Sequence, residues 1–216
     1  HWANKHNIKY ILNGSNISTE CVRNPKEWIY YGTDFIFLRS ILKKFGTVKL
    51  KTFPLSSIFY HKLYLKYIRR INVVKPLNLL PYNKSEAQAE LNKLYGWESF
   101  NQKHFESRFT RFYEGYWLPT RFGFDTRRVQ FSSLILTGQM TRDEALQELE
   151  KEPYDKNTID DDFKYVANKL NISENELRSY HEMDLKFYSD YPNVEWMFDI
   201  GAKFLQLIGS EASVKR

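Results

Sequence analysis

Apolar residues in the first half of the chain alternate between short β-prone runs and segments with helical spacing. Ile8–Leu12 is a β-prone run that stops at a turn signal, Asn13-Gly14, and it predicts a buried strand. Ile71–Val74 is a second such run, closed by a Lys-Pro pair that cannot continue a central strand. Periodic apolar positions predict helices over residues 34–45, 55–68 and 83–96. Strands separated by helices of this length favour a parallel sheet whose strands end at one edge.

Residues with capping preferences mark the ends of these predicted helices. Gly46 and Gly96 follow the last apolar positions of their segments, as C-caps do. Pro54 stands where a helix start tolerates proline. Asn83 with Glu86 three residues later resembles an N-cap pair.

The second half of the chain contains no good strand and reads as helical throughout. Thr141 with Glu144, and Ser173 with Glu176, have the spacing of capping boxes. Helices are predicted over residues 102–116, 126–137, 142–151, 160–170, 174–190 and 194–208. We therefore expect an α/β domain over residues 1–96 and an all-helical substrate- or partner-binding region over residues 97–216.

Composition narrows the class of protein. The 216 residues carry 32 Lys+Arg against 26 Asp+Glu, and a net charge of +6 suits nucleotides, nucleic acid or phosphorylated sugars, although ordinary solubility explains it as well. The single cysteine, Cys21, excludes a disulfide framework, and the five scattered histidines have no zinc-site spacing. No apolar run reaches about 18 residues and the first residues are polar, so we expect a cytoplasmic protein without a membrane partner.

Polar residues follow both predicted strands, at the edge where ligands bind in open parallel sheets. After the first strand, Gly14 lets the backbone approach a ligand, Asn16 and Thr19 offer hydrogen bonds, and Glu20 is an oxygen ligand suited to Mg²⁺ held with phosphates. After the second, Lys84 falls in the first turn of a helix, where free backbone N–H groups and the dipole favour a phosphate. A polar loop with helix caps, and an isolated exposed lysine, are the alternatives.

Arginines concentrate in the helical half. One stripe of the helix predicted over residues 102–116 is aromatic core: Phe105, Phe109, Phe112 and Tyr116. The next stripe carries His104, Arg108 and Arg111, with Glu114 close to it, and further on come Arg121, Asp125, Arg127, Arg128 and Arg142. So many arginines suggest that their planar guanidinium groups bind phosphate or carboxylate. A solvated helix face on which arginines pair with glutamates explains them equally well. The Asp160-Asp161-Asp162 run is interpreted as charge complementing a helix N-terminus, with metal binding a remote alternative.

Three blocks of residues resemble a known enzyme family. Gly14-Ser15-Asn16 with Thr19-Glu20, and Lys75-Pro76-Leu77 with Lys84-Ser85-Glu86-Ala87, resemble the later motifs of PP-loop ATP pyrophosphatases. The block from Glu106 to Ala145, with Leu-Pro-Thr-Arg-Phe-Gly-Phe-Asp-Thr-Arg-Arg at its centre, is similar to the N-acetyl sugar amidotransferases, which make acetamidino sugars for bacterial surface glycans. The family's Ser-Gly-Gly-x-Asp-Ser loop and preceding cysteine pairs have no counterpart here. We therefore expect this chain to be a C-terminal portion that alone neither binds ATP tightly nor turns over.

The resemblance implies a fold and a reaction. The fold would be the remnant of a parallel Rossmann-like (adenine nucleotide alpha hydrolase-like) sheet, followed by the helical region. In the reaction, an acetamido oxygen of a nucleotide-linked sugar attacks the α-phosphate of ATP and pyrophosphate leaves. Ammonia then displaces AMP from the imidate adenylate. Such enzymes act in the synthesis of lipopolysaccharide (LPS) O-antigen or of flagellin glycans. Ammonia would come from separate glutaminase and synthase-like subunits.

The resemblance also implies roles for individual residues. Glu20 would hold Mg²⁺ and Lys84 would neutralise charge on the phosphates. The nucleotide would bind at Gly14, Ser15, Asn16 and Thr19, and the sugar nucleotide or adenylate at Arg108, Arg111, Asp125, Arg127 and Arg128. Two alternatives stay open: a tRNA-modifying PP-loop enzyme whose basic helices grip RNA, and a non-catalytic basic binding module. Under the amidotransferase interpretation a nucleic-acid partner is not expected.

Overall fold

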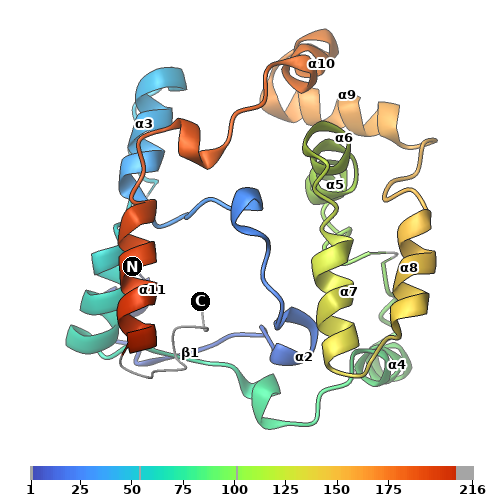
Figure 1. Ribbon diagram of the computed structural model, residues 1–216, viewed down its shortest axis with the longest axis horizontal. Helices are drawn as coiled ribbons and strands as arrows, with labels where there is room; N and C mark the ends of the chain where they lie inside the picture. Colours follow the sequence, from blue (N-terminus) through green and yellow to red (C-terminus); the bar gives the residue numbers. More distant parts are fainter. Residues whose placement is uncertain (1, 54, 101, 208–216) are drawn as a thin grey trace. The chain divides into compact units, whose positions relative to one another are not determined.

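The computed structural model describes residues 2–53, 55–100 and 102–207, with side chains up to residue 201 (Figure 1). The predicted helix start at Pro54 lies outside these residues. Contacts group the chain into two compact units: unit 1 holds residues 1–11, 29–73 and 186–216, and unit 2 holds residues 12–28 and 74–185. Because this grouping follows contacts and not chain order, the domain boundary expected after residue 96 stays a prediction.

The sheet has two parallel strands, β1 (Tyr10–Leu12) and β2 (Asn72–Val74). The Asn72 N–H donates to the carbonyl of Lys9 at 2.7 Å, and the Asn13 N–H donates to that of Val74 at 2.9 Å. The predicted parallel pairing is thus confirmed. The prediction of a buried first strand is wrong, because Tyr10 is 67% and Leu12 is 74% exposed. Two strands with open faces cannot bury their side chains as a sheet covered on both sides does, and a Rossmann-like remnant stays a prediction.

Unit 1 contains the helices of both chain ends. They are α1 (Trp2–Lys5), α3 (Phe35–Phe45), the π-helix η2 (Tyr60–Ile68), the short 3₁₀ turn η5 (Tyr188–Asp190) and α11 (Glu195–Leu207). The helix predicted over residues 34–45 is α3, and Gly46 follows it as expected. The helix predicted over residues 55–68 begins only at residue 58, because the Ser57 hydroxyl accepts the Tyr60 N–H at 3.3 Å and caps it there.

A fully buried carboxylate organises unit 1. Asp34 is 0% exposed, and its Oδ1 caps α3 by accepting the Phe37 N–H at 2.9 Å. Its Oδ2 accepts the Val194 N–H at 2.7 Å and the Tyr188 hydroxyl. Burial, together with the hydrogen bond and charge of Asp34, raises the pKa of Tyr188. One side chain therefore fixes residues 188–194 against the start of α3.

The regular structure of unit 2 is helical in its described residues, apart from the strand ends at Leu12 and Val74. Before residue 100 its elements are α2 (Ile17–Glu20), the 3₁₀ turns η1 (Lys26–Trp28) and η3 (Pro76–Leu79), and α4 (Lys84–Tyr95). After it come α5 (Arg108–Thr110), the π-helix η4 (Arg111–Trp117), α6 (Leu118–Phe122), α7 (Arg127–Leu136), α8 (Arg142–Glu150), α9 (Ile159–Leu170) and α10 (Glu174–Glu182).

Local capping signals predicted most of these ends correctly. The Asn83 side chain caps α4, and Gly96 ends that helix with φ at 64°, which favours glycine. Thr141 and Glu144 form a complete capping box at α8. The core of unit 2 joins η4, α9 and α10 through Phe112, Phe163, Val166, Ala167 and Leu177.

The helix predicted over residues 102–116 begins later, at Arg108. His104 has a left-handed backbone with φ at 68°, which ends any helix there, and the Ser107 hydroxyl caps the new start. The predicted aromatic stripe is partly wrong: Phe112 is 3% exposed, but Phe109 is 48% exposed. A π-helix has more residues per turn than an α-helix, so η4 changes which side chains share a face.

The helix predicted over residues 174–190 ends at Glu182. The Arg121 guanidinium donates to the carbonyls of His181 and Asp184, which satisfies groups left free at the end of α10. Residues 183–187 are not helical, and η5 follows. The arginine that contacts this helix end lies about 60 residues away in sequence, so the local sequence does not indicate the contact.

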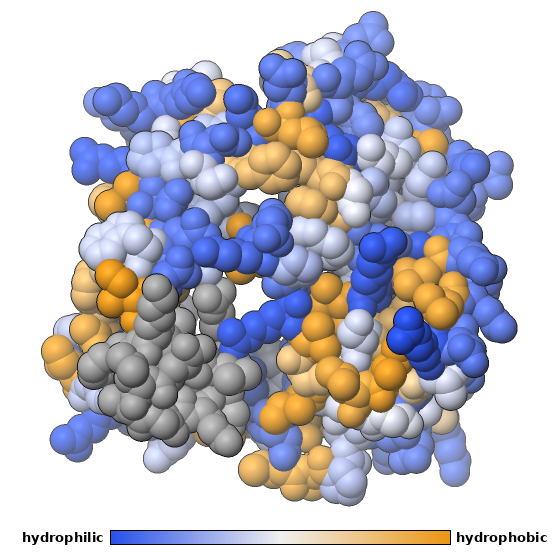
Figure 2. Space-filling model, in the orientation of Figure 1, coloured by the Kyte–Doolittle hydropathy of each residue, from blue (hydrophilic) through white to orange (hydrophobic). Residues whose placement is uncertain are grey.

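Apolar side chains lie on the surface where α7 and α8 run beside each other (Figure 1, Figure 2). Leu136 is 73% and Leu146 is 49% exposed.

In the described part of the chain, no helix has the length and apolar character needed to cross a lipid bilayer.

Candidate functional site

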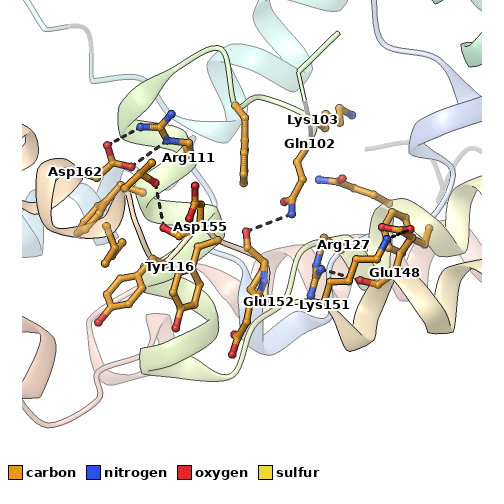
Figure 3. Close-up of a pocket in the computed structure, with 18 of the residues that line it drawn as sticks. Gln102, Lys103, Arg111, Tyr116, Arg127, Glu148, Lys151, Glu152, Asp155 and Asp162 are labelled. Atoms are coloured by element: carbon orange, nitrogen blue, oxygen red, sulfur yellow. Dashed lines mark hydrogen bonds and ion pairs between the residues drawn. The ribbon is translucent and has the colours of Figure 1, made fainter.

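A cavity of about 430 Å³ in unit 2 gathers charged side chains of both signs (Figure 3). We call it the central cavity. Its cationic residues are Lys84, Lys103, Arg111, Arg127 and Lys151, and its acidic residues are Glu148, Glu152, Asp155 and Asp162. Aromatic side chains, among them Phe105, Phe112 and Tyr116, form the rest of its wall. A cavity with several cations and an apolar wall suits an anionic organic ligand.

Two further cavities adjoin it through shared residues. The aromatic cavity, of about 480 Å³, shares Lys84, Gln102 and Lys103 with the central cavity and adds Trp97 and Phe100. The small cavity, of about 180 Å³, contains Thr19 and Glu20 and also includes Lys103. Lys103 therefore lines all three cavities.

Lys103 forms an ion pair with Glu20. The Lys103 Nζ lies 2.6 Å from the Glu20 Oε1, although 83 residues separate the two in sequence. Burial alone would raise the pKa of Glu20, but the hydrogen bond and charge of Lys103, with Ser15 and Lys75, lower it below the ordinary value of 4.5. Glu20 is accordingly held as a carboxylate beside the cationic residues.

Lys84 offers an unpaired ammonium group to the central cavity. Burial, and then the charge of Lys103, lower its pKa. Among the described residues no carboxylate pairs with it. Two ammonium groups that repel each other across a cavity favour an anion bound between them.

The start of α4 does not offer the free N–H groups expected there. The Lys84 N–H donates to the Gln139 Oε1 at 2.8 Å, and the Asn83 Oδ1 accepts those of Ser85 and Glu86 at 2.9 and 3.3 Å. That part of the prediction is wrong, because side-chain caps already satisfy these donors. What this helix end presents to a phosphate is the Lys84 side chain.

Glu20 and Lys84 follow two strands that end at one edge of the sheet, a placement that predicts one shared cavity for the two side chains. Glu20 lines the small cavity and Lys84 lines the central cavity, and Lys103 belongs to both. The acid and the base therefore line two different cavities that have Lys103 in common, and not one shared cavity.

The loop after β1 is largely a helix cap. Asn16 is 8% exposed, and its Oδ1 accepts the Thr19 N–H at 2.9 Å and the Thr19 hydroxyl at 3.1 Å. A Cβ added at Gly14 would meet no atom within 4 Å, so its described neighbours do not require glycine. Asn16 and Thr19 thus follow the alternative of a polar capped loop, and a nucleotide role for Gly14, Ser15, Asn16 and Thr19 stays a prediction.

Arg108 and Arg111 both bind one buried carboxylate. Asp162 is 2% exposed; its Oδ1 lies 2.7 Å from the Arg108 Nε and 2.6 Å from the Arg111 Nη2. The hydrogen bond to Asp162 raises the pKa of Arg111. For Asp162 the interpretation as helix-terminus charge is incomplete, because its main partners are these guanidinium groups. Arg111 also lines the central cavity, whereas Arg108 lies over the Tyr165 ring, 4.6 Å from its centre.

Arg127 and Arg128 have different surroundings. Arg127 is 5% exposed; its Nε and Nη2 donate to both carboxylate oxygens of Asp125, and its Nη1 donates to the carbonyl of Glu148 at 3.0 Å. Arg128, by contrast, is exposed and lies outside the central cavity, in a groove between α7 and α8. Arg127 is thus the one of the pair placed to meet a ligand in the central cavity.

A magnesium ion could gain one protein ligand here. The described residues contain no group of three or more His, Cys, Asp or Glu able to hold a metal ion. Mg²⁺ is commonly bound by one or two carboxylates together with substrate phosphates and water. Glu20 fits that pattern as a single carboxylate, which would exchange its bond to Lys103 for the ion.

Sequence reasoning missed two residues of the site. Lys103 fell inside a predicted helix and received no role, and no local signal identifies it, because its importance comes from distant Glu20. Asp162 did carry a signal. It precedes Phe163 on a helix whose apolar positions include Val166, so it lies on the face that packs inward.

Comparisons with known proteins bear on the helical part of the chain. No curated protein and no solved structure matches the sequence. Residues 106–204, which include Arg108, Arg111 and Arg127, match the family model of the C-terminal domain of WbpG-like LPS biosynthesis proteins. Over this stretch, which is less than half of the chain, the sequence is similar to a domain of LPS biosynthesis proteins.

Proposed function

We propose that this chain is part of an ATP-dependent N-acetyl sugar amidotransferase of the PP-loop type, acting in the cytoplasm in LPS or related surface-glycan synthesis. The observation that carries the proposal is the half-buried Lys84 ammonium, which pairs with no carboxylate among the described residues and lines one cavity with Lys103 and Arg111. Cations gathered in this way suit the phosphates of a nucleotide-linked sugar or of an adenylate. The similarity to WbpG-like proteins gives the biosynthetic context.

The residues divide into ligand-facing and supporting groups. Lys84, Lys103 and Arg111 would meet phosphate oxygens, because their side chains line the central cavity. Asp162 and Asp125 would position Arg111 and Arg127 through charge-assisted hydrogen bonds. Arg108 would act through Asp162, and exposed Arg128 would reach only an extended part of the substrate.

ATP would supply the adenylyl group that activates the acetamido oxygen, with release of pyrophosphate, and this group would leave as AMP when ammonia takes its place. Glu20 would hold Mg²⁺ on one side of Lys103 while the lysines neutralise phosphate charge on the other. Because the side chains of the central cavity surround it on several sides, they would reduce the access of water to the activated group.

Separate glutaminase and synthase-like subunits would supply ammonia. Glutaminases of the Cys-His type need a histidine beside the nucleophilic cysteine. Cys21, the single cysteine of the sequence, instead directs its thiol to the carbonyl of Ser133, with the sulfur 3.7 Å from the oxygen. This surrounding supports an external ammonia source.

A substrate panel tests the proposal. The protein, purified as its gene encodes it, would receive ATP, Mg²⁺ and ammonium salt with a UDP-N-acetyl sugar, with tRNA, or with neither, and AMP release would be measured. AMP formed only with the sugar supports the amidotransferase. AMP formed only with tRNA would replace it with the tRNA-modifying enzyme, and no AMP in any reaction would favour the non-catalytic basic module.

A further inference from the structure

The aromatic cavity beside the central cavity presents two ring systems to a ligand. Trp97 is 38% and Phe100 is 53% exposed, and both line it. Among the described residues neither ring stacks on another aromatic side chain. Exposed aromatic surface on a cavity wall, without an internal partner, is what a bound ring would cover.

Backbone contacts hold Trp97 in place. It follows Gly96, whose left-handed backbone ends α4 and turns the chain. The Trp97 N–H donates to the carbonyl of Leu91 at 3.5 Å, and the Asn92 amide donates to the carbonyl of Trp97 at 3.0 Å. Because its main chain is fixed to the helix, the backbone that carries the indole needs no ordering when a ligand binds.

Polar groups lie around the two rings. Gln88, Gln102, His104 and Glu106 share this cavity. The Gln102 amide nitrogen donates to the carbonyl of Pro153 at 3.2 Å, which leaves its oxygen able to accept another hydrogen bond. Amide and carboxylate groups beside an aromatic face suit a ring that is apolar on its face and polar at its edge.

The aromatic cavity continues into the cationic one. Lys84, Gln102 and Lys103 belong to both, so one ligand can place a ring on Trp97 and a phosphate between the two lysines. We infer that the aromatic cavity is the subsite for a ring of the phosphate-linked substrate, either its base or its pyranose. The inference rests on the proposed function for the identity of that substrate as a nucleotide-linked sugar.

Calorimetric titration of the 216-residue chain tests the subsite. The ligands are UDP-N-acetylglucosamine, UDP, N-acetylglucosamine 1-phosphate and inorganic pyrophosphate. Trp97→Ala should weaken binding of UDP-N-acetylglucosamine about tenfold, as loss of stacking does, and change pyrophosphate binding less than about twofold. If Trp97→Ala also weakens binding of UDP but not of N-acetylglucosamine 1-phosphate, the subsite holds the base. If it weakens binding of the sugar phosphate but not of UDP, the subsite holds the pyranose.

Matched variants separate the subsite from folding and from the phosphate site. Trp97→Phe keeps an aromatic face and should retain most of the affinity. Lys84→Met should weaken binding of all four ligands. Lys93→Met, at an exposed position of α4, should leave binding of all four unchanged. Unchanged affinity for every ring-bearing ligand in Trp97→Ala overturns the subsite, as does absence of binding by all four ligands. The proposed function is judged separately, by sugar-dependent AMP release.

Discussion

Single side chains set the electrostatics of the site, and Lys103 is the first of them. Its ion pair keeps Glu20 ionised, and its charge acts on Lys84. Neither effect depends on neighbours in sequence, because Lys103 lies 83 residues from Glu20. The candidate acid and base at the strand ends could be predicted from local motifs, but the lysine between them could not.

Removal of Lys103 should change the titration of Glu20. A carboxyl whose folded pKa is lowered contributes stability that is present above its ordinary pKa and is lost as pH falls through the lowered value. In the native chain we expect the Glu20 carboxyl to titrate below 4.5, and in Lys103→Met at a higher pH, because only the hydrogen bond of Ser15 and the charge of Lys75 then oppose burial. Carbon-detected NMR titration of labelled glutamate measures both. Equal midpoints in the two proteins would contradict the ion pair.

Two adjacent arginines should differ in their effect on stability. Arg127→Ala leaves the partly buried Asp125 carboxylate unpaired and should lower the free energy of unfolding by about 3 kcal/mol. Arg128→Ala, at an exposed position, should change it by less than about 0.5 kcal/mol. Urea denaturation followed by circular dichroism compares them. Arg127→Lys should recover little, since an ammonium cannot replace the planar guanidinium; full recovery would count against this account.

At the scale of elements, helix ends carry the most local information. Asn83, Gly96 and the pair Thr141 and Glu144 act within one helical turn, which is why their roles could be predicted. The π-helix η4 and the early end of α10 could not, because they depend on tertiary packing and on Arg121. The late starts of the helices predicted from residues 55 and 102 have local caps at Ser57 and Ser107, whereas the end of α10 has a distant partner in Arg121.

The cap of α4 supports the placement of Lys84. Asn83→Ala removes the acceptor of two N–H groups and should lower the free energy of unfolding by about 1 kcal/mol, whereas Asn83→Asp keeps an acceptor and should stay close to the native value. Thermal denaturation of the three proteins gives the comparison. If alanine and aspartate are equally damaging, the side chain does not act as a helix cap.

At the scale of the whole molecule, each unit is assembled from segments distant in sequence. Unit 1 joins residues 29–73 with residues 186–216, and the buried Asp34 carboxylate connects them through Val194 and Tyr188. Asp34→Ala should therefore speed amide hydrogen exchange over residues 188–200, with little change in α7 and α8 of unit 2. Mass spectrometry of peptides resolves the two regions. Tyr188→Phe, which removes one of the three hydrogen bonds, should have a smaller effect, and an equal effect on both units would contradict this organisation.

We propose that the cavity around Lys103 serves activation of an acetamido oxygen by ATP. The most direct measurement follows a heavy-oxygen label placed in the acetamido carbonyl of a UDP-N-acetyl sugar, with the protein as its gene encodes it, ATP, Mg²⁺ and ammonia. We expect the label to appear in the phosphate of AMP while the sugar gains nitrogen from ammonia. Label that remains on the sugar, or AMP that carries none of it, would contradict the claim.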